Sequence, residues 1–146
     1  MRGELDKIID EKKLLLPILT EIQDREGYIS EETVREVAKK IGIPMSKIFG
    51  AATFYSFLTT KPQGKYVIHI CNSPSCYVNG SMNLIKVIEK ELGIKSGETT
   101  DDGLFTLHIG SCIGCCDNAP AMLINDKEHF NLNKKKVKEI LDRCRS

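Results

Sequence analysis

Apolar side chains in the first part of the chain recur at the three- and four-residue intervals of amphipathic helices. "MRGELDKIIDEKKLLLPILTEIQDREGY" contains two such runs, and "REGY", residues 25–28, ends the second. Pro17 lacks a backbone donor, so it either opens a second helix or kinks one long helix. We therefore predict a helical bundle over residues 1–60. The apolar positions of the two runs are Leu5, Ile8, Ile9, Leu15, Ile18, Leu19 and Ile22.

A further helix is predicted by capping signals as well as by periodicity. Ser30 can accept hydrogen bonds at a helix start, and the two glutamates after it favour the positive end of the helix dipole. Gly42 is a typical helix stop. The apolar stripe between them is Val34, Val37, Ala38 and Ile41. We predict one more helix over about residues 46–58.

The pattern changes after "TTKPQG", residues 59–64, whose Pro and Gly are typical of a linker. Short apolar runs then predict strands over residues 66–70, 104–109 and 121–124, and helical stripes predict helices over 81–92 and 134–144. We place a domain boundary here and predict a second domain over residues 61–146. Its order is β-α-β-β-α.

This order predicts an α/β fold with a small mixed sheet. A strand, a crossover helix and a second strand form a parallel pair, whereas "NDKEHFN" is short enough to be a hairpin between antiparallel strands. Cys71 directly follows the first strand, and Cys112 follows the second. Because adjacent parallel strands end at the same edge of a sheet, we expect both cysteine groups to reach one site.

Composition limits the classes of protein to which the chain can belong. A charge of +1 with 28% charged residues gives no basic excess of the kind that favours nucleic-acid binding. The start of the chain lacks the apolar core of a secretion signal, and its apolar run at residues 14–19 is too short to cross a bilayer. We expect a cytoplasmic protein without membrane insertion and without a nucleic-acid partner.

Six cysteines in such a chain indicate metal or redox chemistry rather than disulfides, because the cytoplasm is reducing. Cys71 and Cys76 are separated by four residues, and Cys112 can pair with Cys115 or with Cys116. Four thiolates from two loops can hold zinc or an iron–sulfur cluster. The wider spacing favours a two-iron cluster, in which each iron takes two thiolates.

The residues between these cysteines suit a buried cluster. Gly114 permits close approach of backbone N–H groups to sulfur, and Ile113 offers apolar cover. Pro74 and Pro120 stiffen the two loops, so that less entropy is lost when the ligands converge.

The motifs "CNSPSC", "ELGIKSGETTDDGLFTLHIGSC" and "SCIGCCDNAP" resemble those of a known family, and so do "EIQDREGYIS" and "IGIPMSKIFGAATFYSFL" upstream. The chain resembles the thioredoxin-like [2Fe–2S] ferredoxin subunit of NADH dehydrogenase, respiratory complex I. Counterparts of that subunit occur in NAD(P)-linked [FeFe]-hydrogenases and formate dehydrogenases. The resemblance covers nearly the whole chain.

The resemblance implies a cluster held by a C-x4-C pair and a C-x3-C pair, which here are Cys71 with Cys76 and Cys112 with Cys116. Cys115 is then a spacer. The resemblance further implies a thioredoxin-like C-terminal domain and docking beside a larger subunit that binds FMN and NAD(H), among further iron–sulfur subunits. In that setting the chain is an electron-transfer subunit of an oxidoreductase complex, with no catalytic residues of its own.

Several residues depart from the family pattern. Cys115 is a fifth thiol, residues 73–75 replace a glycine-containing loop, and "HFNL" at 129–132 replaces a tyrosine-glycine pattern. Cys144, near the end of the last helix, is predicted not to be a ligand. The terminal electron acceptor stays open among quinone, protons, ferredoxin and carbon dioxide, as does the choice between NAD and NADP.

Three other functions compete with this interpretation. An iron–sulfur regulator with a helix-turn-helix fits the helix pair around Gly42, but "IFGAATFYSFL" offers almost no polar side chains to DNA. A structural zinc module remains an alternative. A thiol oxidoreductase would need its C-x-x-C after the first strand of the domain, not the second.

Aromatic and histidine residues have simpler explanations than cofactor binding. The aromatics of the last N-terminal helix are read as core or subunit-interface residues, in a helix that is built for burial. His69 and His108 are read as sheet residues rather than as ligands. The aromatics are Phe49, Phe54, Tyr55 and Phe57.

Overall fold

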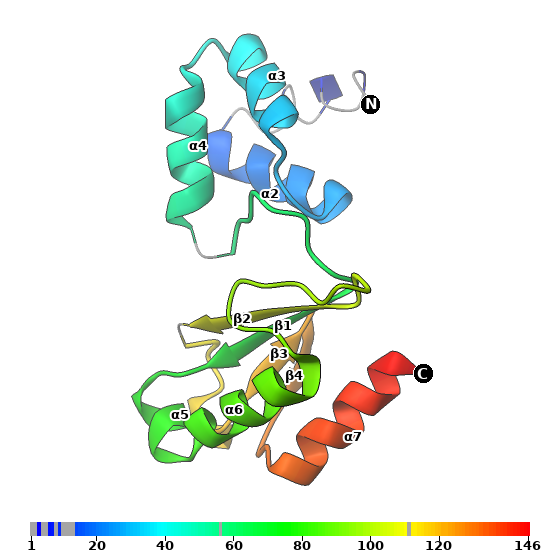
Figure 1. Ribbon diagram of the computed structural model, residues 1–146. Coiled ribbons are helices and arrows are strands. Elements are labelled where there is room, and N and C mark those ends of the chain that lie inside the picture. Colours follow the sequence, from blue (N-terminus) through cyan, green and yellow to red (C-terminus); the bar gives the residue numbers. More distant parts are fainter. Residues whose placement is uncertain (1–2, 4–5, 8, 10–13, 56, 111) are drawn as a thin grey trace. The chain divides into compact units, whose positions relative to one another are not determined.

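The computed structural model describes residues 1–146 except 1–2, 4–5, 8, 10–13, 56 and 111. The chain forms two compact units, Met1–Pro62 and Gln63–Ser146. The first is made of helices, and the second combines a sheet with helices (Figure 1). Leu5 and Ile8, which we assigned to a helical stripe, lie outside the described residues.

The helices α2 (Leu15–Glu26), α3 (Glu31–Ile41) and α4 (Met45–Phe54) pack around one core in the first unit. Pro17 lies in the first turn of α2, so it belongs to a helix start and does not kink a longer helix. The side chains of α3 and α2 meet in the core as their periodicity predicts. The core includes Ile18, Leu19, Ile22, Val34, Val37 and Ile48.

The predicted caps of α3 are present. The Oγ atom of Ser30 accepts a hydrogen bond from the backbone N–H of Thr33 at 3.1 Å. Gly42 follows the helix with a φ of 76°, in the left-handed region where glycine carries no steric penalty.

The end of α4 differs from the prediction, because the helix stops at Phe54 rather than near residue 58. The cause is Gln23 of α2. Its side-chain oxygen accepts a hydrogen bond from the N–H of Thr59 at 2.6 Å, and its amide nitrogen donates to the carbonyl oxygen of Phe57. These backbone groups are therefore held by a side chain from another helix instead of by further helical turns.

The aromatic residues of this region also differ from a helix built for burial. Phe49 is 51% exposed, Phe54 79% and Phe57 52%, whereas Tyr55 is partly buried against the core. Ile48 and Ala52 supply the buried side of α4 instead. The core alternative is therefore wrong for the three phenylalanines, and the subunit-interface alternative stays a prediction. For Phe49 and Phe54, position on the helix and not apolar character decides which side chains face inward.

The second unit contains a four-stranded sheet in the order β2-β1-β3-β4. Strand β1 (Tyr66–Cys71) pairs in parallel with β2 (Phe105–Gly110), and β3 (Met122–Ile124) pairs antiparallel with β1 and with β4 (Lys127–His129). The mixed sheet, the crossover and the hairpin were all predicted. The register places Cys71 opposite Gly110, so both parallel strands end together.

Helices α6 (Ser81–Leu92) and α7 (Lys134–Arg145) cover one face of this sheet (Figure 1). Alternate residues of the strands point to that face because side chains alternate along a strand. Three short elements were not predicted, the helix α5 (Pro74–Val78), the 3-10 turn η1 (Cys116–Asn118) and strand β4, which lies within the segment assigned to the hairpin connection. The core under the helices includes Ile68, Ile70, Leu84, Ile88, Leu107 and Val137.

None of the helices in the described part of the chain has the length and apolar character needed to cross a bilayer.

Candidate metal centre

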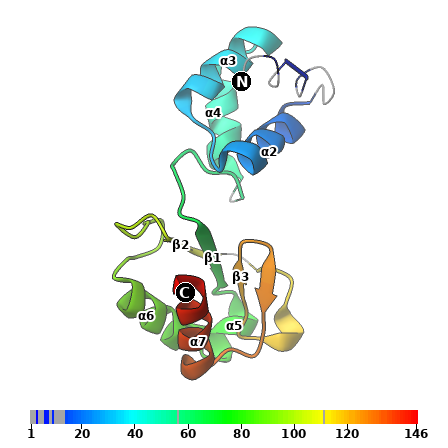
Figure 2. The ribbon, with the colours of Figure 1, turned by 90° about the vertical axis from the view of Figure 1, so that its right-hand side faces the viewer.

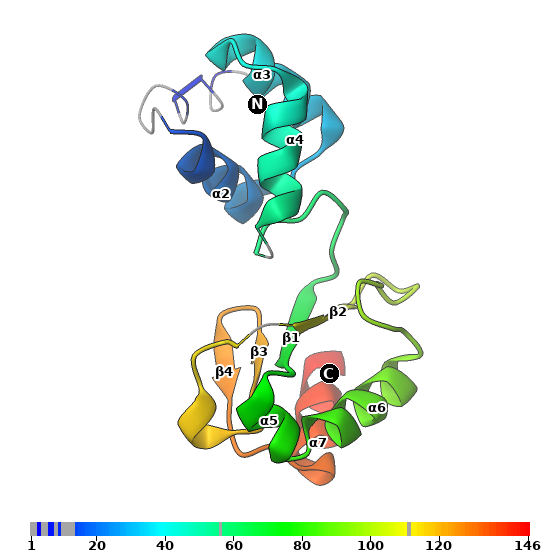
Figure 3. The same ribbon diagram turned by 90° about the vertical axis from the view of Figure 1, so that its left-hand side faces the viewer.

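Cys71 and Cys76 are held by the end of β1 and the short helix that follows it. Cys71 is the last residue of the strand, and Cys76 lies within α5, which leaves the strand end as Figure 3 shows. Both side chains are buried. The backbone N–H of Ser73 donates a hydrogen bond to the Cys71 sulfur at 3.4 Å. The first loop thus presents two thiols with a backbone donor already directed at one of them.

Cys112 and Cys116 lie in the segment after β2. Their sulfur atoms are 3.3 Å apart, and both residues are exposed. The backbone N–H of Gly114 donates to the Cys112 sulfur at 3.3 Å. Gly114 has a φ of 83°, which turns its amide toward the sulfur and which other residues rarely adopt. The close approach of backbone to sulfur predicted for Gly114 is confirmed.

The two loops meet at the same edge of the sheet. The N–H of Asn72 donates to the carbonyl oxygen of Gly110 at 3.0 Å, which extends the parallel pairing beyond both strands. The hydroxyl of Ser75 then donates to the carbonyl oxygen of Cys116 at 3.2 Å. Helix α5 accordingly lies beside η1 in the views of Figures 2 and 3.

The thiols are close enough to influence one another's ionisation. Burial raises the pKa of Cys76, and the neighbouring Cys71 and Cys112 raise it further. Burial also acts to raise the pKa of Cys71, but hydrogen bonds from Ser73 and Cys76 outweigh it, so that this pKa is lowered. The hydrogen bond with Cys112 is the main cause of the raised pKa of Cys116. Cys71 therefore ionises most readily of the three, and its charge opposes ionisation of the others.

Two further cysteines differ in their positions. Cys115 lies half-buried beside the four, and its sulfur donates to the carbonyl oxygen of Ile113 at 3.7 Å. Burial raises the pKa of Cys115, with smaller effects from Glu128 and Cys112. Cys144 lies on α7, where it packs against the core of the second unit. In the described residues it makes no sulfur–sulfur contact.

The donor set suits a cluster of two irons. Four thiols come as two pairs, one pair from each loop, and each loop directs a backbone N–H at a sulfur. Such N–H groups stabilise the sulfur charge that metal binding requires. Among the residues that the structure describes, no three His, Cys, Asp or Glu side chains are gathered to hold a single ion.

Sequence reasoning missed the helix that carries Cys76 and the contact that joins the loops. Ser73 before Pro74 is a signal for a helix start, because proline suits the first helical position. No signal in the sequence indicates the hydrogen bond of Ser75, which depends on how β1 and β2 pair. Residues 73–75 were noted only as a departure from a glycine-containing loop.

His69 and His108 lie in the sheet. They occupy paired positions on β1 and β2, and their rings stack with centroids 4.9 Å apart. A ring nitrogen of His108 is hydrogen bonded to the amide of Gln63 at 2.8 Å.

Comparison with known proteins gives consistent results. The sequence model of the family described as thioredoxin-like [2Fe-2S] ferredoxin matches residues 2–145. A subunit of the NADH-quinone oxidoreductase of Escherichia coli strain K12 is 36% identical over 140 residues, which cover 96% of this chain and 84% of that protein. The corresponding protein of Pseudomonas aeruginosa strain PAO1 is 34% identical over 139 residues, covering 95% and 84%.

A solved structure has a similar fold. The crystal structure of an NAD+-reducing [NiFe]-hydrogenase in the air-oxidized state superposes with a TM-score of 0.76 at 22% identity. The match covers 87% of this chain but only 22% of the hydrogenase chain. It therefore supports the fold of this chain over most of its length.

Proposed function

Because this chain belongs to the thioredoxin-like [2Fe–2S] ferredoxin family, we propose that it is the electron-transfer subunit of an NAD(P)H-linked oxidoreductase complex, an NADH dehydrogenase or a hydrogenase. The observation that carries the proposal is the meeting of two cysteine pairs at the common end of two parallel strands. The chain has no catalytic residues of its own in this role.

The ligands of the cluster are Cys71, Cys76, Cys112 and Cys116. When bound, a [2Fe–2S] cluster accepts and releases single electrons. The pair on the first loop is buried and the pair on the second is exposed, so the site has an inner and an outer side. The N–H groups of Ser73 and Gly114 stabilise thiolate charge on either side. Cys115 and Cys144 are not ligands.

The partner is a larger subunit that binds FMN and NAD(H), which this chain does not bind. Support comes from an apolar surface beside the buried ligand Cys76. Tyr77 and Val78, which follow it in α5, are exposed, with Val78 at 82%, and so is Met82 in the first turn of the next helix, α6. Exposed apolar groups of this size are typical of protein interfaces. The flavin exchanges single electrons with the cluster across this surface, and further iron–sulfur subunits complete the complex.

The N-terminal residues 1–60 form a separate helical domain, and residues 61–146 form the cluster domain. The exposed Met45, Phe49 and Phe54 of α4 give the first domain a contact surface of its own. An apolar surface suits a protein partner and not DNA, where basic and polar side chains contact phosphates and base edges. This disfavours the alternative of a helix-turn-helix regulator.

The complex works in the cytoplasm or at the cytoplasmic face of a membrane.

Electron paramagnetic resonance of anaerobically purified protein tests the ligand set. We expect a rhombic signal after reduction with dithionite and about two irons per chain, with iron and sulfide counted on the same sample. Serine variants at Cys71, Cys76, Cys112 and Cys116 should each lose the signal. The matched serine variants at Cys115 and Cys144 should keep it.

Two results would contradict the proposal. One is stoichiometric zinc without a signal in protein that has been reconstituted with iron and sulfide, which would make a structural zinc module the better account. The other is loss of the signal in Cys115→Ser with retention in Cys116→Ser, which would change the ligand set.

Co-purification with the other proteins of the complex tests the partner. Val78→Asp and Phe54→Asp should keep the cluster signal and the fold, because both side chains are largely exposed, but should lose the flavin-containing subunit. Lys39→Asp places an aspartate at an exposed position of α3 and should retain the partner. Retention in all three variants would exclude both surfaces.

A further inference from the structure

A cavity of about 600 Å³ lies between the β3–β4 hairpin and α7 in the cluster domain. Its lining belongs to Tyr66 of β1, to residues 124–127 and 129 of the hairpin and to the last turns of α7. The volume is within the range of small-molecule sites, roughly 300–1,000 Å³. None of the four proposed cluster ligands lines the cavity, so it is separate from the metal centre.

The charged groups of the cavity are mainly positive. Lys127 projects from the hairpin and Arg143 from α7, while Asp126 is the acidic residue of the lining. No ion pair within the described residues occupies Lys127 or Arg143. Their charges therefore remain available to a ligand.

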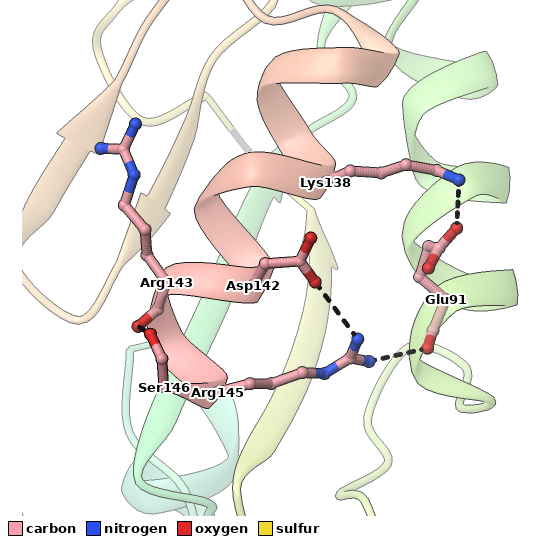
Figure 4. A network of polar contacts seen from close by, with 6 residues as sticks. All are labelled: Glu91, Lys138, Asp142, Arg143, Arg145 and Ser146. Carbon is pink, nitrogen blue, oxygen red and sulfur yellow. Dashed lines mark hydrogen bonds and ion pairs between the residues drawn. The ribbon is translucent and has the colours of Figure 1, made fainter.

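The orientation of Arg143 separates it from the ion pairs on the same helix. Figure 4 shows Lys138 and Arg145 reaching Glu91 of α6, whereas Arg143 extends to the opposite side of α7. The carboxylate of Asp142 lies 3.6 Å from Arg145, so it does not neutralise Arg143. The guanidinium is a planar donor that suits the oxygens of a phosphate or carboxylate.

His129 of the hairpin lines the cavity together with Lys127 and Arg143. Burial lowers the pKa of His129, and Lys127, Lys136 and Arg143 lower it further. Lys136 is committed to the carbonyl oxygen of Phe130, to which its ammonium donates at 2.6 Å. Lys127, His129 and Arg143 thus line one cavity from the hairpin and from α7, and the lowered pKa favours a neutral imidazole at His129.

The rest of the wall is mainly apolar, and the side chain of its polar residue, Asn125, is hydrogen bonded to the backbone of Val67 and Lys65. Ile124 and Ile140 are buried, and Tyr66 is half-buried with its ring against Phe105. The cavity therefore combines an apolar wall with a small number of convergent polar groups, which is the usual composition of a site for a small organic ligand.

We propose that this cavity binds a small organic anion, whose phosphate or carboxylate lies between Lys127 and Arg143 and whose apolar part packs against Tyr66, Ile124 and Ile140. The site is additional to the electron-transfer function. A ligand that contacts both the hairpin and α7 stabilises their packing, because it binds only when the two are together.

Isothermal titration calorimetry of the full-length, cluster-loaded protein with phenyl phosphate tests the site. We expect saturable binding of one equivalent, with benzoate as a second anionic probe and phenol as a neutral one. Lys127→Gln and Arg143→Gln should each weaken binding about tenfold, since each removes a charge-assisted contact. Both side chains are exposed, so both variants should keep the fold and the cluster signal.

Lys135→Gln is the matched control, because Lys135 is exposed on the same helix but does not line the cavity. It should change the affinity by less than about twofold. Backbone amide shifts on titration should change at residues 124–129 and 140–144. The proposal is overturned if no saturable binding occurs, if Lys135→Gln weakens binding as much as the other two variants, or if phenol binds as tightly as phenyl phosphate.

Discussion

The hydroxyl of Ser75 donates a hydrogen bond to the carbonyl oxygen of Cys116 at 3.2 Å. This bond joins α5, which follows the first strand, to η1, which follows the second. Ser75 precedes the proposed ligand Cys76 and Cys116 is itself a proposed ligand, so the contact ties the two cysteine pairs to each other. This hydrogen bond helps to assemble the site, and the spacing of the cysteines in the sequence does not indicate it.

Removing this hydroxyl should loosen the metal centre without removing a ligand. A hydrogen bond of this kind contributes about 1 kcal/mol, so in Ser75→Ala we expect the bound cluster to be lost to a chelator about fivefold faster. The loss is followed by visible absorbance under anaerobic conditions. Ser146→Ala, which removes a hydroxyl that donates to the carbonyl oxygen of Arg143 at the far end of α7, should match the unmodified protein. Equal rates of cluster loss in all three proteins would show that Ser75 has no role in assembling the site.

Glycine is required at position 114 because of its backbone conformation, and not because a larger side chain would lack space. A Cβ at this position meets no atom within 4 Å, but the φ of 83° is costly for other residues, by about 1–2 kcal/mol for alanine. Gly114→Ala should therefore lower the stability of the cluster toward chelators and the melting temperature of the loaded protein. Gly114→Asn should do so less, because asparagine tolerates this conformation.

The control for Gly114 is Gly110 at the end of β2, where a Cβ also meets nothing within 4 Å and the backbone is not in the left-handed region. Gly110→Ala should leave both measurements unchanged. If Gly114→Ala behaved like Gly110→Ala, the directed amide of Gly114 would have no role in holding the sulfur.

Gly64 is restricted by space. A Cβ there would lie 2.9 Å from backbone atoms of Leu104 and Phe105, and the N–H of Gly64 donates to the Thr106 hydroxyl at 2.7 Å. Gly64→Ala must displace backbone, so we expect a loss of about 2–3 kcal/mol in the free energy of unfolding, measured with urea.

At Gly50, in contrast to Gly64, an added side chain would meet no neighbouring atom within 4 Å. Gly50 lies inside α4 with open space around it, and alanine is the better helix former by about 1 kcal/mol. Gly50→Ala should therefore raise the stability of the helical unit. A stabilised Gly64→Ala, or a destabilised Gly50→Ala, would contradict the backbone geometry described for these positions.

The stacked histidines predict a dependence on pH. Burial lowers the pKa of His69 below its ordinary value of 6.5, and the charge of His108 lowers it further. Burial also lowers the pKa of His108. Below pH 6.5 the unfolded chain therefore binds more protons than the folded one, so the free energy of unfolding falls as the pH falls. Above this value both states are neutral at these rings and the dependence disappears.

Urea unfolding between about pH 7.5 and pH 5 checks this prediction, since most carboxylates remain ionised over that range. The double variant His69→Asn with His108→Gln should show a flatter curve. A smaller slope should persist from His129, whose pKa is lowered as well. Stability that is constant, or that rises toward acid pH, would show that partial burial does not lower the pKa values of this pair in the folded chain.

The sequence predicted those elements whose signals are local. Ser30 and Gly42 delimit α3 because capping depends on neighbouring residues, and the strand and helix order of the cluster unit follows from alternation and periodicity. The end of α4 could not be predicted, because it is set by Gln23 on another helix. The exposure of Phe54 could not be predicted either, since apolar character does not distinguish a core from an interface.

The candidate site shows the same division. Strand order indicated that Cys71 and Cys112 would reach one edge, and the parallel register confirms it. The family was recognised from its motifs, and its sequence model confirms that recognition. The choice of Cys116 over Cys115 rests on the resemblance and stays a prediction. Lys127 and Arg143 are far apart in the chain, and only the packing of the hairpin on α7 brings them to one cavity.

The parallel pairing of β1 and β2 has a consequence for folding. The two cysteine pairs flank the segment that contains α6 and β2, so a metal bound to both pairs acts as a cross-link between the ends of that crossover. A cross-link of this length restricts the unfolded chain by about 3–5 kcal/mol, as a disulfide would. In the proposed role, cluster binding and folding of the second unit are therefore one coupled equilibrium, and a chain that loses its irons also loses the constraint that favours its native topology.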